Sequence, residues 1–95
     1  MLRGEIHTAT TQTFRQAVLV TGKLIQIDEG TIEIKLGDED EEGNFIPQRD
    51  GNGIPTGIIN IIDLQPGQKV NPRHLGTVYE LRVIDGKLDP SHDLG

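Results

Sequence analysis

The sequence predicts a mainly β domain, a small antiparallel β-barrel or β-sandwich of about six or seven short strands with one long acidic loop. Apolar residues alternate with polar ones in several short runs, the period of a half-buried strand. The large apolar residues are mostly Ile, Leu and Val, with two Phe and one Tyr, and branched aliphatic residues favour strands. Twelve Gly and five Pro among 95 residues provide the reversals that short strands need. The length fits one domain over 1–95.

The clearest element is a β-hairpin at 23–36. Its return arm alternates apolar and polar residues from 31 to 36, and its outward arm places Ile25 and Ile27 on one face. Gly30 lies between the arms, where a tight reversal needs a positive φ.

The chain before this hairpin is less regular. Residues 1–13 are polar and Thr-rich, and we expect an arm or an edge strand there. The run 14–20 is compatible with a short helix capped by Thr13 or with a strand, and the strand is favoured because β-branched residues fill its end.

The C-terminal part reads as turns and short strands. A Pro-Gly turn is expected at 65–68, and alternation predicts a strand at 77–84. The Asp-Gly pair at 85–86 is the strongest two-residue hairpin signal in the chain. The polar tail at 89–95 is expected to fray or to dock on a neighbouring subunit.

The segment 37–57 is a long acidic stretch with few apolar anchors. Eight acidic residues and one Lys lie between Asp28 and Glu42, while the rest of the chain is close to neutral. A loop of this length is expected to be functional or to be a solvated connection, with Phe45 and Ile46 pinning its middle to the body.

The acidic stretch also suggests a calcium site. Its spacing matches the first half of an EF-hand loop, but Arg49 occupies the twelfth position, where a bidentate Glu is required. A looser site for Ca²⁺ is the remaining cofactor hypothesis, against a solvated acidic surface that maintains solubility. Its ligands would be Asp38, Asp40 and Glu42, with Asp50 or Asn52 as additional donors.

The most apolar segment, 58–64, suggests an interface. Alternation places Ile59 and Ile61 on one face and Ile58 and Ile62 on the other, so both faces are mostly apolar. A chain this short has little material to cover both faces. We therefore expect these four isoleucines to contribute to a homo-oligomer interface, with an intramolecular sandwich as the alternative.

Several function classes are disfavoured. The absence of Cys excludes disulfides and thiol chemistry, and no nucleophile, phosphate-binding or metalloprotease motif is found. Basic residues are scattered, so neither nucleic acid nor a membrane surface is an expected partner. No apolar run has the length of a membrane span and no signal peptide is evident, so a soluble chain is expected.

Two functions remain. The first is a non-enzymatic assembly protein that self-associates and contacts other proteins of a particle, such as a virion decoration or connector protein. The alternative is a monomeric binding module whose segment 37–57 holds Ca²⁺ or a cationic partner.

Overall fold

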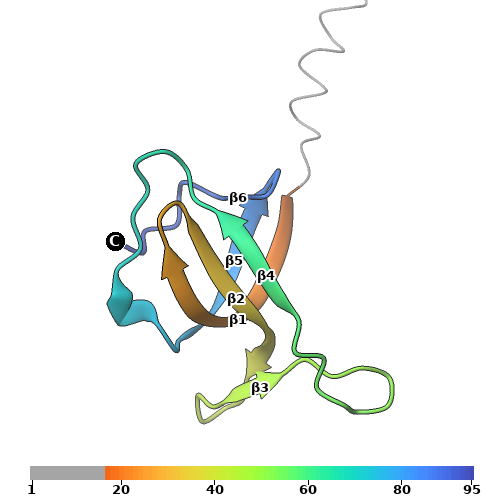
Figure 1. Ribbon diagram of the computed structural model, residues 1–95. Coiled ribbons are helices and arrows are strands. Elements are labelled where there is room, and N and C mark those ends of the chain that lie inside the picture. The colour runs from red at the N-terminus through yellow and green to blue at the C-terminus, as the bar shows by residue number, and fades with distance from the viewer. Residues whose placement is uncertain (1–16) are drawn as a thin grey trace, which may run out of the picture.

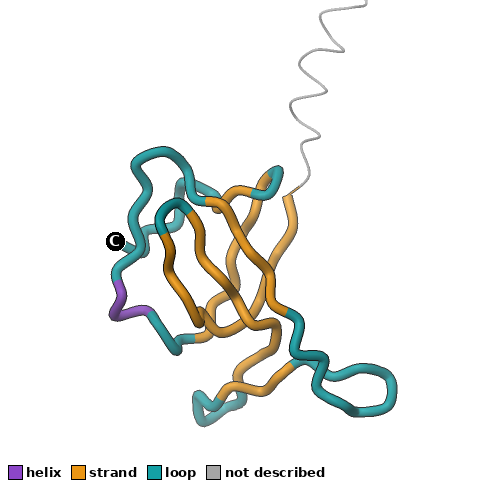
Figure 2. Tube along the Cα trace, in the orientation of Figure 1, coloured by secondary structure: helices purple, strands orange, loops and turns teal. Residues whose placement is uncertain are grey.

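The computed structural model describes residues 17–95, which form six strands and one 3₁₀ turn (Figures 1 and 2). The expected arm at 1–13 and the start of the segment 14–20 lie outside the described residues. The mainly β prediction is confirmed, and the architecture is a barrel. No helix in the described part of the chain has the length and apolarity to cross a membrane. The elements are β1 (Ala17–Asp28), β2 (Thr31–Glu39), β3 (Phe45–Pro47), β4 (Ile59–Asp63), η1 (Pro72–His74), β5 (Val78–Ile84) and β6 (Lys87–Leu88).

Five of these strands close the barrel. Around it the order is β1-β2-β4-β6-β5, and β5 pairs again with β1. Neighbouring strands are antiparallel except for β4 and β6, which are parallel. Strands β5, β1, β2 and β4 therefore have the 4-1-2-3 order of a Greek key. A five-stranded Greek-key barrel is the architecture of the OB-fold, and this likeness concerns connectivity, not function.

The hairpin predicted at 23–36 is confirmed, with Asp28 opposite Thr31 and Gly30 at φ 79°. Its outward arm differs from the prediction in one respect. A β-bulge between Leu24 and Gln26 makes Ile25 an extra residue, so Leu24 is the fully buried one. A bulge shifts the alternation by one position, and strict alternation along the sequence cannot reveal it.

The core is aliphatic and fills the barrel. Its buried members are Val20, Leu24, Ile32, Ile34, Ile62, Val70, Leu81, Val83, Leu88 and Leu94.

The C-terminal tail docks on its own chain, contrary to the expectation that it would fray or reach a neighbour. Leu94 is buried and forms a parallel bridge with Val70, and the Asn71 N–H donates to the Leu94 carbonyl at 2.6 Å. The backbone N–H of Arg82 also donates to Nε2 of His92 at 2.8 Å. One apolar residue in a polar tail has no periodicity, so its burial depends on contacts that only the fold supplies.

The segment 37–57 is more ordered than the single loop that was predicted. Strand β2 continues to Glu39, a turn at 40–44 follows, and β3 pairs back on the end of β2. Residues 48–57 then form a second projection, which we call the finger (Figure 1). Because the end of β2 leaves the barrel, both of its faces meet water, and the alternation that marks a half-buried strand does not extend into it.

Strands β3 and β4 are two parts of one interrupted strand. Both pair antiparallel with β2, with Asp38 opposite Ile46 and Ile34 opposite Asn60. The two registers differ by ten residues, which is the length of the finger. The N–H of Gln48 donates to the Leu36 carbonyl, and the Leu36 N–H donates to the Ile58 carbonyl, so the strand resumes where it was interrupted.

Candidate functional site

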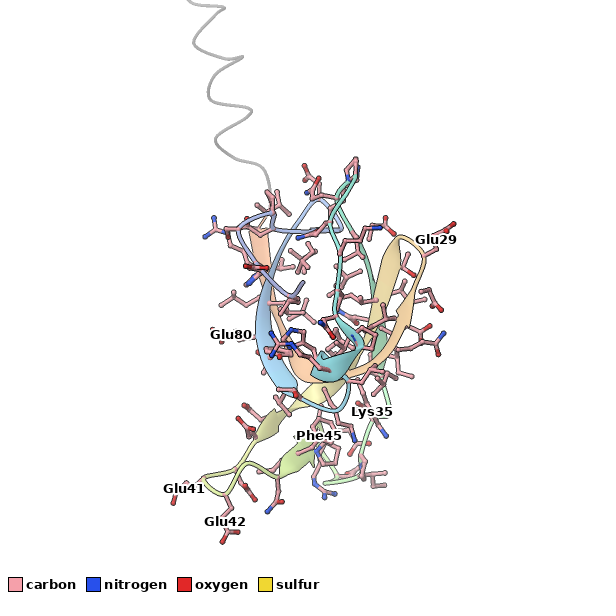
Figure 3. The ribbon with its side chains drawn as sticks, turned by 90° about the vertical axis from the view of Figure 1, so that its left-hand side faces the viewer. Glu29, Lys35, Glu41, Glu42, Phe45 and Glu80 are labelled. Carbon is pink, nitrogen blue, oxygen red and sulfur yellow. The ribbon has the colours of Figure 1, made fainter. Side chains whose placement is uncertain are left out.

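Strand β4 divides its isoleucines between the core and solvent. Ile62 is 2% exposed inside the barrel, whereas Ile59 and Ile61 are 44% and 67% exposed on the outer face. Strand β4 therefore has the two apolar faces that alternation along the sequence predicted. On the neighbouring strand β2, Lys35 lies opposite Ile59 and Glu33 lies opposite Ile61. Lys35 extends outward from the barrel wall in Figure 3.

The four predicted interface residues do not form one surface. Ile62 is a core residue, so it is not available to a partner. By alternation Ile58 belongs to the same face as the buried Ile62. It is nevertheless 47% exposed, because it precedes β4 at the end of the barrel. Exposed apolar surface at this strand therefore comes from Ile58, Ile59 and Ile61.

A groove of about 560 Å³ lies at the same end of the barrel, next to Asn60 of β4. It separates the first half of β1 from the diverging end of β2 and from β3, and its apolar walls include Leu19, Leu36 and Ile46. Leu19 is 64% exposed while Val20 next to it is buried, so the strand that the sequence favoured at 14–20 is buried on one face only where β1 begins. Sequence reasoning did not find this groove, because strands that diverge produce no local pattern.

The acidic residues proposed as calcium ligands form a turn. Oδ1 of Asp40 accepts the backbone N–H groups of Glu42 at 2.9 Å and Asn44 at 2.8 Å. The Asn44 N–H above all, with a smaller contribution from Glu42, holds the pKa of Asp40 below its ordinary value of 3.8. Figure 3 shows Glu41 and Glu42 at the tip of the β2–β3 hairpin, pointing away from the barrel.

Asp38 stands in β2, while Asp40 and Glu42 belong to the turn that follows it. Among residues 17–95, no three His, Asp or Glu side chains are arranged so that they could hold a metal ion. Calcium binding stays a prediction from the sequence that this geometry does not favour.

The finger repeats the same turn ten residues later. Oδ1 of Asp50 accepts the N–H groups of Asn52 at 2.8 Å and Ile54 at 3.0 Å, and the Gly53 N–H donates to the Asp50 carbonyl. In both turns an Asp begins the reversal and a Gly with positive φ stands three residues later. The spacing of acidic residues and Gly that resembled a calcium loop is therefore explained by a turn that an Asp side chain closes.

The β2–β3 hairpin is also held against β1. Nζ of Lys23 lies 4.8 Å from the centre of the Phe45 ring, a cation–π contact. Gly37 leaves room for that ring, since a Cβ there would lie 2.4 Å from a ring carbon. This contact is consistent with the prediction that Phe45 pins the segment to the body.

Two of the three histidines lie among the described residues, and both have structural partners. Nδ1 of His74 pairs with the Tyr79 hydroxyl, and the two rings are edge-to-face with centroids 5.6 Å apart. His92 accepts the backbone N–H of Arg82. Because the His74 ring is held by Tyr79 and the His92 ring by the backbone of Arg82, the two histidines do not share a site.

Comparison of the sequence with protein-family models and curated proteins, and with solved structures, gave no match.

Proposed function

We propose that this protein is a non-enzymatic structural module that self-associates through the outer face of β4. The observation that carries the proposal is the exposure of Ile59 and Ile61, at 44% and 67%, on a strand whose inner face is already used by the core. Large apolar side chains that gather on a strand exposed to solvent are typical of protein–protein contacts.

The energetics show what such an interface needs. The exposed parts of Ile59 and Ile61 amount to roughly one complete isoleucine side chain, worth about 1.5–3 kcal/mol per copy when buried. Two copies together gain about 3–6 kcal/mol, whereas association costs about 4–15 kcal/mol. Isoleucine burial alone is therefore too small, and a stable oligomer needs additional contacts such as backbone pairing.

We further propose a role in a larger assembly, of the decoration or connector type found in virus particles. The supporting observation is the pair of projections, the β2–β3 hairpin and the finger, each stiffened by an Asp-closed turn (Figure 1). Such projections suit contacts with neighbouring proteins. Coat or tail genes adjacent to the gene for this chain would support the role, and a metabolic operon would count against it.

Self-association is tested by sedimentation equilibrium of the full chain from 1 to 100 μM, concentrations chosen to cover Kd values of about 1–100 μM. We expect a mass above the 10.4 kDa of one chain. Ile61→Lys should return the mass to that of a monomer, because it places a charge in the apolar contact. Ile54→Lys is the matched control, since Ile54 is 59% exposed on the finger. A wild-type mass of one chain throughout would refute the proposal and favour the binding-module alternative.

A further inference from the structure

We propose that two copies of this chain join edge to edge through β4, with Ile59 of one copy opposite Ile61 of the other. This inference rests on the proposed function, since it specifies how the self-association would occur. The pairing extends the β2–β4 sheet across a twofold axis, so both copies use the same surface. It also supplies the backbone contacts that isoleucine burial lacks.

The backbone groups of β4 point alternately toward β2 and toward the opposite edge of the strand. The Leu36 N–H donates to the Ile58 carbonyl at 2.9 Å, and the Leu64 N–H donates to the Gly30 carbonyl at 2.9 Å. Hydrogen-bonded pairs alternate along an antiparallel ladder, so Asn60 and the residues two positions from it direct their N–H and C=O groups toward β2. The groups of Ile59, Ile61 and Asp63 therefore point to the opposite edge.

Strand β6 occupies one end of that opposite edge. Within residues 17–95, the strand pairing of β4 on this side consists of Asp63 with Lys87 of β6, where the Asp63 N–H donates to the Gly86 carbonyl at 3.0 Å. Strand β6 is two residues long and does not extend along the rest of β4. The edge at Ile59 and Ile61 is therefore a template for another strand.

The hydrogen-bonding groups at this edge select the register of the pairing. An axis through Asn60 places Ile59 opposite Ile61 twice, and each of these pairs exchanges both of its hydrogen bonds. An axis through Ile61 places Ile59 opposite Asp63, whose N–H is already used. An axis through Ile59 places Ile61 opposite Gly57, which lies in the finger with φ 67° and is not extended. Of the three axes, the one through Asn60 is the one that pairs the N–H and C=O groups of both Ile59 and Ile61.

Charges on β2 are compatible with the same register. Lys35 is the β2 neighbour of Ile59, and Glu33 is the β2 neighbour of Ile61. With the axis through Asn60, each row across the joined sheet reads Lys35, Ile59, then Ile61 and Glu33 of the second copy. Each row then has opposite charges at its two ends. With the axis through Ile61, one row would have Glu33 at both ends. The two ends of a row lie three strand spacings apart, about 14 Å, where salt screens most of the interaction, so the hydrogen-bonding groups and not the charges decide the register.

Single-cysteine variants test the register, because the chain has no Cys of its own. The twofold axis brings the two Asn60 Cα atoms to about 4.5 Å, as in a non-hydrogen-bonded pair, which suits a disulfide. Asn60 lines the groove, so an oxidant can reach a thiol there. Under mild oxidation at equal concentration, Asn60→Cys should form covalent dimers faster than Ile61→Cys. Ile54→Cys, on the exposed finger, is the control for random collision.

A second pair of variants tests the backbone contact. Ile61→Pro removes an N–H at the open edge and no bond to β2, whereas Ile61→Val keeps the N–H and a similar side-chain volume. Each copy loses one interchain hydrogen bond, so the dimer loses two. At about 1 kcal/mol for each bond, Ile61→Pro should raise the Kd of the dimer roughly 30-fold relative to Ile61→Val. Far-ultraviolet circular dichroism shows whether each variant is folded.

The outcomes separate the two proposals. A monomeric wild-type chain overturns self-association itself. An oligomer in which Ile61→Cys crosslinks faster than Asn60→Cys, or in which the Pro and Val variants dimerise equally, overturns the edge pairing and leaves self-association standing. Fastest crosslinking at position 60 together with a weakened Pro variant supports the inference.

Discussion

Replacing Gly22 by Ala tests the closest approach of two strands in the barrel. Gly22 lies where β1 turns from its pairing with β5 to its pairing with β2. A Cβ at this position would lie 2.2 Å from the Lys35 carbonyl oxygen and 2.7 Å from Cγ2 of Ile34. Because the nearest obstacle is backbone, a change of side-chain rotamer cannot relieve the clash, and the two strands must separate.

The expected cost follows from two opposing terms. Overpacking of this kind costs about 1–3 kcal/mol, whereas Gly→Ala restricts the unfolded chain and returns about 0.4–1 kcal/mol. Since the obstacle is rigid, we expect the upper part of the first range and a net loss of about 2 kcal/mol. For a domain of this size, that loss lowers Tm by about 8–16 °C.

The assay is urea unfolding followed by circular dichroism, with thermal melts at one fixed protein concentration, because self-association changes the apparent stability. Gly51→Ala is the neutral control, since no atom lies within 4 Å of its Cβ position, and it should change stability by less than about 0.5 kcal/mol. Gly30→Ala also has open space but φ of 79°, and it should cost about 1 kcal/mol from backbone strain. If Gly22→Ala is as stable as Gly51→Ala, the result would contradict the close approach of β1 and β2 at Gly22.

The docking of Leu94, the pairing of Tyr79 with His74 and the bond from Asn44 to Asp40 can each be tested by a substitution or a titration. Leu94→Ala should cost about 2–4 kcal/mol in urea unfolding because Leu94 is buried, whereas Leu75→Ala, at an exposed site, should cost less than about 0.5 kcal/mol; equal losses would show that the tail does not dock. Tyr79→Phe removes a hydroxyl paired with a histidine ring and should cost about 1–2 kcal/mol, measured in the same way; an unchanged midpoint would contradict that pairing. Asp40 has a lowered pKa in the folded state, so its contribution to the turn is complete above the unfolded value of 3.8 and is lost as pH falls through the folded value. The amide shift of Asn44 should follow that titration below pH 3.8, and an amide that does not respond would argue against the bond.

The calcium hypothesis has a direct test. Calorimetric titration of the full chain with CaCl₂ should give no saturable heat if the Asp40 carboxylate is committed to closing its turn. A saturable heat that disappears in Asp38→Asn but not in Glu29→Gln, a change of an exposed residue in the β1–β2 turn, would restore the predicted site.

Local features of this chain could be predicted from the sequence because their causes are local. Gly30 and the pair Asp85-Gly86 adopt positive φ at their turns, and few other residues tolerate that conformation. Alternation predicted the strand at 77–84, which is β5 with Leu81 and Val83 on its buried face, and it identified β4 as apolar on both faces. The mainly β class follows from these patterns without knowledge of which strands meet.

Tertiary structure decided which apolar residues the core would use. Alternation gives two faces to a strand but does not say which is inside, so the separation of Ile62 from Ile61 required the closed barrel. The burial of Leu94 depends on Val70, a partner distant in sequence. The bulge at Ile25 and the short strand β3 form within local hairpins, but alternation along one strand does not specify the register with its partner. Among residues 17–95, the edge of β4 at Ile59 and Ile61 has no strand partner because β6 ends after two residues, and the length of β6 cannot be read from the sequence of β4.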